Sequence, residues 1–124
     1  MDEGLLDNWT TQLRKGLLEL CVLNALAGRR MYGYDIVRTL RGVEGLVITE
    51  GTIYPLLSRL RRDGWVQSAL EESSSGPARK YYELTPVGRG VRERMNSVWA
   101  KIVDGVRGLQ SGISMENGQN GQTH

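Results

Sequence analysis

The hydrophobic period of this chain changes twice, and these changes constrain its fold more than any other feature. Apolar residues recur at three- and four-residue spacings up to Asp63-Gly64, which is typical of amphipathic helices. Residues 65–70 and 79–85, on either side of a polar loop over residues 71–78, follow the pattern of two strands. A helical period then returns at Pro86. The predicted order is three helices, a β-hairpin and one long helix.

Two of the predicted helices lie in the first third of the chain. The first begins near Trp9, capped by Asp7 or Asn8. It ends at Gly28-Arg29-Arg30, because glycine suits the residue after a helix and cations suit its negative end. The second runs from about Gly33 to Leu40.

The third predicted helix is capped by Thr49 and ends at Asp63-Gly64. Pro55 removes one hydrogen bond, so the helix is expected to start late or to bend slightly. Its expected buried stripe consists of Ile53, Leu56, Leu57 and Leu60.

The last helix is predicted to open at Thr85-Pro86, with threonine as the cap and proline at the first helical position. Its apolar residues approach a heptad seam. They are Val87, Val91, Met95, Val98, Trp99, Ile102, Val103, Val106 and Leu109. From Ser111 onward Gly, Gln, Asn and Ser dominate, and a disordered tail is expected.

Composition excludes several function classes. Cys21 is the only cysteine and His124 the only histidine, so neither an intramolecular disulfide nor a Cys-His or Ser-His pair in the folded part is available. We expect Cys21 to be a buried small hydrophobe, and we expect no metal site, no cofactor and no enzymatic activity. No apolar stretch reaches the ~20 residues that span a bilayer, and the acidic N-terminus lacks the basic start of a signal peptide. The chain is therefore expected to be cytoplasmic.

The predicted fold class is mainly α with a small β-hairpin, arranged as a winged helix-turn-helix with a long C-terminal dimerisation helix. Residues 1–85 would form the DNA-binding domain, residues 86–110 the dimerisation helix and residues 111–124 the tail. The net charge is only +2, but residues 29–62 hold seven basic and three acidic side chains. This local excess of four favours double-stranded DNA as the partner. A winged helix that binds another protein is the alternative, since the fold alone does not decide between them.

Four motifs in order resemble the PadR family of transcriptional regulators, specifically its smaller subfamily with a single C-terminal dimerisation helix. They are Met31-Tyr32-Gly33-Tyr34-Asp35-Ile36, the segment from Thr49 to Leu60, Asp63-Gly64-Trp65-Val66, and the segment from Arg79 to Gly88. The resemblance covers about residues 12–110. It implies that the segment from Thr49 to Leu60 is a recognition helix and that the last helix dimerises.

The first turn of this recognition helix offers groups that suit DNA. Thr49 and Thr52 carry hydroxyls for base edges, and Gly51 lets the backbone approach a phosphate. Tyr54 belongs to the same turn. Tyr54 and Pro55 both lie within the segment that resembles the recognition helix of the family, so both are expected to contact DNA. The alternative is that Thr49 is only a cap and Gly51 only a tolerated small residue.

Phosphate contacts are expected from residues outside that turn. The resemblance implies one for Tyr34, whereas Tyr32 is expected to pack in the core. Arg79 and Lys80 follow the wing loop, where they can reach phosphates unless they form a solvated charge pair with Glu71 and Glu72. Arg59 can also reach a phosphate. Tyr81 and Tyr82 point to opposite sides of a strand, so one of them should pack on the core.

The apolar seam of the last helix is too long for so small a domain to cover, which predicts a homodimer on an inverted repeat. Trp99 from each subunit could hold a planar aromatic effector at the interface, and the resemblance implies a pocket there. Met95, Val98 and Ile102 would form the neighbouring walls. The alternative is that Trp99 only packs the interface.

Overall fold

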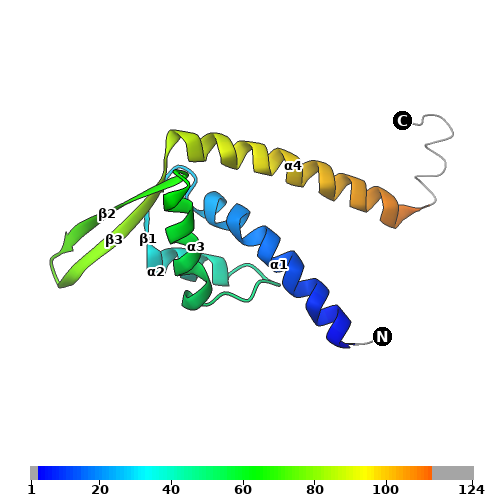
Figure 1. Ribbon diagram of the computed structural model, residues 1–124, viewed down its shortest axis with the longest axis horizontal. Coiled ribbons are helices and arrows are strands. Elements are labelled where there is room, and N and C mark those ends of the chain that lie inside the picture. Colours follow the sequence, from blue (N-terminus) through cyan, green and yellow to red (C-terminus); the bar gives the residue numbers. More distant parts are fainter. Residues whose placement is uncertain (1–2, 113–124) are drawn as a thin grey trace. The chain divides into compact units, whose positions relative to one another are not determined.

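The computed structural model describes residues 3–112 and has, within them, four helices and a three-stranded antiparallel sheet (Figure 1). The elements are α1 Glu3–Ala25, β1 Met31–Tyr32, α2 Gly33–Arg41, α3 Glu50–Arg62, β2 Val66–Ser73, β3 Gly76–Leu84 and α4 Pro86–Ser111. The predicted fold class is confirmed, and the short strand β1 is added to it.

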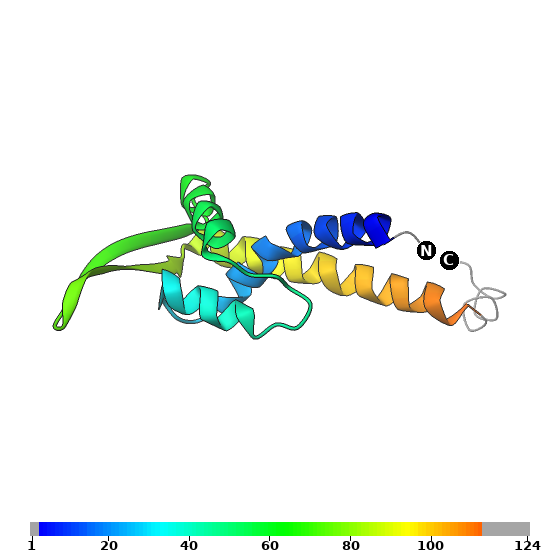
Figure 2. The ribbon, with the colours of Figure 1, turned by 90° about the horizontal axis from the view of Figure 1, so that it is seen from below.

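The chain divides into two compact units, and the boundary falls between Arg92 and Glu93, inside α4. The first unit holds α1, α2, α3, the sheet and the first turns of α4. Within this unit the hairpin of β2 and β3 projects beyond the helices (Figure 2). The second unit holds the rest of α4. Ser111 ends this helix, and the remainder of the predicted tail, from residue 113, lies outside the described residues.

The core of the first unit is formed mainly by apolar side chains from α1 and the turn that follows it, α2, α3 and β2. The most completely buried are Val22, Leu23, Leu26, Ile36, Val37, Ile53, Leu57, Leu60 and Val66. Each such side chain contributes about 1.5–3 kcal/mol relative to an exposed position. Three members of the stripe predicted for α3 are thus buried, whereas Leu56 is only half-buried.

Helix α1 begins at Glu3, so the predicted start near Trp9 is wrong. Leu5, Leu6 and Trp9 continue the three- and four-residue spacing, and Glu3 in the first turn suits the positive end of the helix. The C-terminal prediction is confirmed. Gly28 has a positive φ of 73°, and the Arg29 Nε donates to the Ala25 carbonyl at 3.0 Å.

Helix α3 begins directly after Thr49, whose Oγ1 accepts from the Thr52 N–H at 3.2 Å. The predicted cap is confirmed, and the late start expected from Pro55 is wrong. The cap fixes the first turn, and the thirteen-residue helix tolerates the single hydrogen bond missing at Pro55. The loop before α3 is tied to α1, because the Arg14 Nε donates to the Gly45 carbonyl at 2.7 Å.

The hairpin is longer than predicted, so the loop expected over residues 71–78 is wrong. Pairing continues to Ser73 opposite Gly76, which leaves only Ser74 and Ser75 between the strands. Backbone hydrogen bonds pair these residues although their polar side chains indicated a loop. Strand β1 pairs with β3 only at Tyr81 and Tyr82. Pro77 therefore lies where this side of β3 has no neighbouring β1 residue, and the missing N–H of proline is tolerated there.

The start of α4 is joined to the end of α3. The predicted cap is confirmed, since the Gly88 N–H donates to the Thr85 Oγ1 at 2.9 Å. The Thr85 hydroxyl donates to the Gly64 carbonyl at 2.7 Å, and the Thr85 N–H donates to the Trp65 carbonyl at 3.0 Å. Gly88 is buried against this segment, and a Cβ there would overlap the Trp65 carbonyl oxygen.

Replacing Gly88 by alanine should therefore destabilise the fold by at least about 1–3 kcal/mol, the usual cost of overpacking. The matched control is Gly90→Ala in the same helix, where a Cβ meets nothing within 4 Å. That change should stabilise the chain by ~0.5–1 kcal/mol, because glycine is a poor helix former. Urea unfolding followed by circular dichroism measures both. Equal urea midpoints for Gly88→Ala and Gly90→Ala would contradict the close approach of Gly88 to the Trp65 carbonyl.

Candidate nucleic-acid interface

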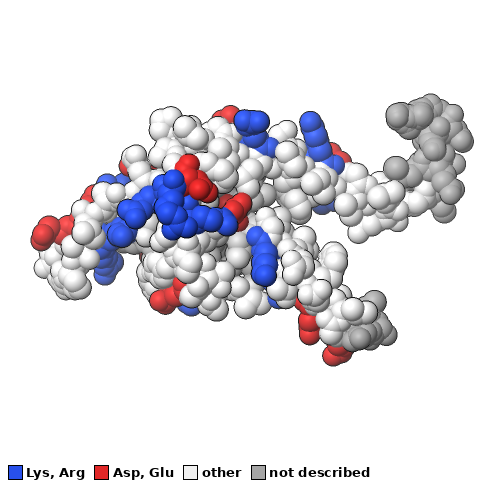
Figure 3. Space-filling model, in the orientation of Figure 1, with Lys and Arg blue, Asp and Glu red and all other residues white. Residues whose placement is uncertain are grey.

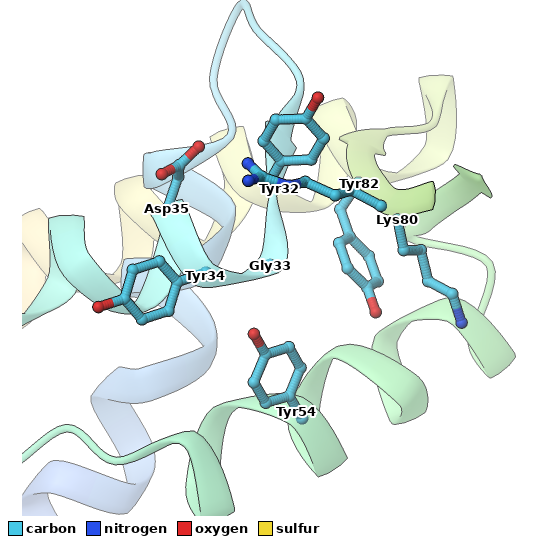
Figure 4. Close-up of a pocket in the computed structure, with 8 residues that line it drawn as sticks. Tyr32, Gly33, Tyr34, Asp35, Tyr54, Lys80 and Tyr82 are labelled. Atoms are coloured by element: carbon cyan, nitrogen blue, oxygen red, sulfur yellow. The ribbon is translucent and has the colours of Figure 1, made fainter. Parts of the chain in front are cut away.

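Four of the predicted DNA-binding residues meet in one hollow of about 380 Å³ between α2, α3 and β3 (Figure 4). They are Tyr34, Tyr54, Arg79 and Lys80. The hollow is completed by Tyr32, Gly33, Asp35 and Tyr82. Residues from three elements thus converge on one face, although they are far apart in sequence.

Gly33 allows α2 and α3 to approach each other beside this hollow. A Cβ at Gly33 would lie 2.6 Å from Cε1 of the Tyr54 ring, which rises from α3 toward Gly33 in Figure 4. Burial, followed by the charge of Glu50, raises the pKa of Tyr54. Its hydroxyl therefore stays protonated at neutral pH and can donate a hydrogen bond.

The N-terminus of α2 opens on the same hollow. Its N-cap, Tyr32, makes no side-chain hydrogen bond to the helix, so the positive end of α2 is left without a side-chain cap. Tyr34, in the first turn, is half exposed. Asp35 also lines the hollow, and its Oδ1 lies 3.9 Å from the Nη1 of Arg38. Hydroxyls, a guanidinium and an ammonium together offer donors to an anionic oxygen such as that of a phosphate.

The first turn of α3 is exposed as a unit. The hydroxyls of Thr49 and Thr52 are 3.0 Å apart, and Thr49 also holds the cap. A Cβ at Gly51 would meet only the Thr49 Oγ1, at 3.8 Å, so packing does not require glycine there. These three residues are accessible to a ligand approaching α3 from its N-terminus.

The remaining predicted contacts of α3 lie in a different groove. Thr52, Pro55 and Arg59 line a hollow of about 480 Å³ against α1, together with Lys15, Leu18, Glu19, Leu56 and Arg62. The guanidinium of Arg59 forms an ion pair with Glu19 of α1. Basic side chains gather over the C-terminal half of α3, with acidic neighbours among them (Figure 3).

Tyr32 is not in the core, so that prediction is wrong. It is half-buried, and its ring stacks on Tyr81 with centroids 3.9 Å apart. Strand β1 brings the two together, since Tyr32 is paired with Tyr81. Strand β1 has only two residues, which is too short to show a hydrophobic period, so the sequence offered no signal for it. Tyr82, on the opposite face of β3, is buried, which confirms that one of the adjacent tyrosines packs on the core.

Cys21 is half-buried, and desolvation raises the pKa of its thiol, which favours a packing role over a reactive one. Within residues 3–112, no three His, Cys, Asp or Glu side chains lie close enough to bind a metal. No helix in that range is long and apolar enough to cross a membrane.

The residues predicted for an effector lie in the second unit, on α4. Trp99 is 39% exposed, and Val98 and Ile102 are more than half exposed. Met95 is half-buried. Their spacing of three and four residues places them along one side of the helix. An apolar helix side of this kind is available to a partner.

Comparison with known proteins agrees with this architecture. The model of the Transcriptional regulator PadR-like family matches residues 22–94, more than half of the chain. The chain is 28% identical over 100 residues to a transcriptional regulator of Mycobacterium tuberculosis, covering 81% of this chain and 92% of that protein.

Two solved structures show the same fold. A PadR family transcriptional regulator from Eggerthella lenta is 32% identical, with a TM-score of 0.75 and coverage of 87% of this chain and 94% of that one. Bacillus subtilis PadR, solved in complex with operator DNA, is 23% identical with a TM-score of 0.59, covering 64% of this chain and 45% of that one. The family match, the relatives and the winged-helix fold show that this chain belongs to the PadR-like family of transcriptional regulators.

Proposed function

We propose that the chain is a homodimeric, ligand-responsive repressor that binds an inverted-repeat operator. The observation that carries the DNA-binding part is the convergence of Tyr34, Tyr54, Arg79 and Lys80 on one hollow beside the exposed first turn of α3. An operator complex of the related Bacillus subtilis PadR supports the same use of this fold.

In this proposal the first turn of α3 enters the major groove, whose ~12 Å width admits a helix. Thr52 contacts base edges, whereas Tyr34, Arg79 and Lys80 contact backbone phosphates. Contacts to bases carry sequence preference, and contacts to phosphates carry affinity and orientation.

The dimer is proposed from two exposed apolar surfaces. In the second unit Val98, Ile102, Val106 and Leu109 are about half exposed or more. In the first unit the N-terminal half of α1 exposes Leu5, Leu6, Trp9 and Leu13. Apolar side chains in such numbers favour association with a second copy. Two-fold symmetry would then present two copies of α3 to major grooves ~34–36 Å apart.

We predict that the chain has about twice its 13.9 kDa mass in solution and binds duplex DNA at low salt. Light scattering measures the mass, and selection from random duplexes identifies the bound sequence. The selected sites should be inverted repeats. A monomer at micromolar concentration that retains no duplex would refute the proposal, and heparin retention without duplex binding would show only a general affinity for polyanions.

Lys80→Ala should weaken binding to all duplexes alike and reduce the log–log salt slope by about one unit for each half-site, because each subunit loses one phosphate contact. Tyr34→Phe should also weaken binding to all duplexes alike. Lys101→Ala, an exposed lysine of α4, is the matched control and should leave the slope unchanged. Thr52→Ala should instead change the preference among sites. Uniform weakening by Thr52→Ala would mean that Thr52 acts only through the α3 cap.

The effector site is proposed on α4. Two Trp99 rings, one from each subunit, would stack on the faces of a planar aromatic molecule, with Met95, Val98 and Ile102 as walls. Stacking contributes about 0.5–1.5 kcal/mol beyond burial for each ring. If the ligand changes how the two α4 helices cross, it lowers DNA affinity, and DNA lowers ligand affinity by the same factor.

Titration with planar aromatic dyes should quench tryptophan fluorescence and release DNA. Trp99→Leu should abolish both effects while the dimer persists. Trp9 and Trp65 also emit, so Trp9→Leu, checked by light scattering to remain a dimer, is the control and should retain the response to ligand. Quenching and DNA release that survive Trp99→Leu in an intact dimer would place the ligand elsewhere.

A further inference from the structure

Arg79 reaches a place that its strand position does not explain. Successive side chains of a strand point to opposite faces, so Arg79 and Lys80 leave β3 on opposite sides. Arg79 is paired with Glu71, and Lys80 is two residues before the buried Tyr82 on the core side. Nevertheless, both Arg79 and Lys80 line the hollow beside α2 and α3.

The ring of Tyr32 accounts for the position of Arg79. The Arg79 Cζ lies over the Tyr32 ring, 4.9 Å from its centroid. Tyr32 in turn stacks on Tyr81 with an interplanar angle of 21°, and the Arg30 Cζ lies 4.2 Å from the Tyr81 centroid. Because the two rings cover each other's inner faces, the two guanidinium groups lie on the outer faces. The result is a four-layer stack in the order Arg79, Tyr32, Tyr81, Arg30.

Arg30, at the far end of this stack, forms an ion pair with a carboxylate that could otherwise pair with Arg79. Glu71 is paired with Arg79 across the strands and could neutralise it. Instead, Glu71 forms its ion pair with Arg30. In the described part of the chain Arg79 has no carboxylate partner. A hydrogen bond to the Tyr32 hydroxyl raises the pKa of Tyr81, so the Tyr81 phenol stays neutral at physiological pH.

We propose that Tyr32 is a positioning residue for DNA binding, which holds the Arg79 guanidinium at the hollow so that it can bind a backbone phosphate. This rests on the proposed function. A guanidinium that stacks flat on an aromatic ring keeps its N–H donors, which lie around its edge, free for a phosphate. The ring therefore fixes the group without occupying its donors. The contact needs the ring and not the phenol hydroxyl.

The test compares Tyr32→Leu, Tyr32→Phe and Tyr81→Leu in the full chain, with a fluorescent mixed-sequence duplex of about three helical turns, ~30 bp, at low salt. Tyr32→Leu should weaken binding about two- to fivefold for each half-site, the range expected for an exposed cation–π contact, and should reduce the salt slope by about one unit for each half-site. Tyr32→Phe should bind like the unaltered chain. Arg79→Ala should weaken binding at least as much, and combining it with Tyr32→Leu should add nothing further.

Tyr81→Leu separates positioning from a purely structural role. It removes the other half of the same stack and the same link between β1 and β3, but not the ring under Arg79. Positioning predicts that Arg79→Ala still weakens binding in the Tyr81→Leu chain and no longer does so in the Tyr32→Leu chain. Equal binding losses for the two leucine variants, with Arg79→Ala additive in both, would overturn the proposal.

An NMR measurement without DNA covers the case in which Tyr32→Leu only unfolds the chain. The Arg79 side-chain Nε–H should show an upfield ring-current shift in the unaltered chain and in Tyr32→Phe. An unshifted resonance in both would overturn the proposal. If the unaltered chain fails to bind any duplex, the proposed function and this inference fall together. If it binds, and Tyr32→Leu binds equally well, only this inference falls.

Discussion

Burial of one face of α3 is the constraint on which the rest of the candidate interface depends. Ile53, Leu57 and Leu60 are fully buried, so the helix cannot rotate about its own axis without exposing them. The cap at Thr49 fixes where the helix begins. With rotation and start both fixed, Tyr54 must face α2, while Pro55 and Arg59 must face α1. The surface that α3 offers to a partner is thus a consequence of its packing.

The sequence predicted those parts of the fold for which the signal lies within a single helix. Helical periodicity and the caps Thr49 and Thr85 located α3 and the start of α4. The errors arose where backbone pairing or context outweighs side-chain type. Ser73 and Gly76 pair although they are turn formers, and α1 extends to Glu3 past residues that could have capped it. Strand β1 exists only because β3 is beside it.

The candidate site was predictable as a list of residues and not as an arrangement. Nine residues were named for DNA contact, and the structure divides most of them between two hollows on either side of α3. Ion pairs explain why charge counting could not anticipate this division. Arg59 is paired with Glu19 and Arg30 with Glu71, each pair separated by about forty residues of sequence. Contacts over such distances leave no periodic signal, so the net charge of +2 says little about which cations are available.

The junction between α3 and α4 determines how a change in the first turn of α4 could reach α3. Two hydrogen bonds from Thr85, to the carbonyls of Gly64 and Trp65, join the segment that follows α3 to the residue that caps α4. Gly88 packs against the same Trp65 carbonyl with no space between them, and Arg92 donates to Asn24 of α1 at 2.7 Å. Well-packed contacts move together or separate, and the segment after α3 is packed closely against the first turn of α4. We therefore expect any reorientation of the first turn of α4 to be accompanied by movement of the C-terminal end of α3, because the contacts that join them all lie within the first unit.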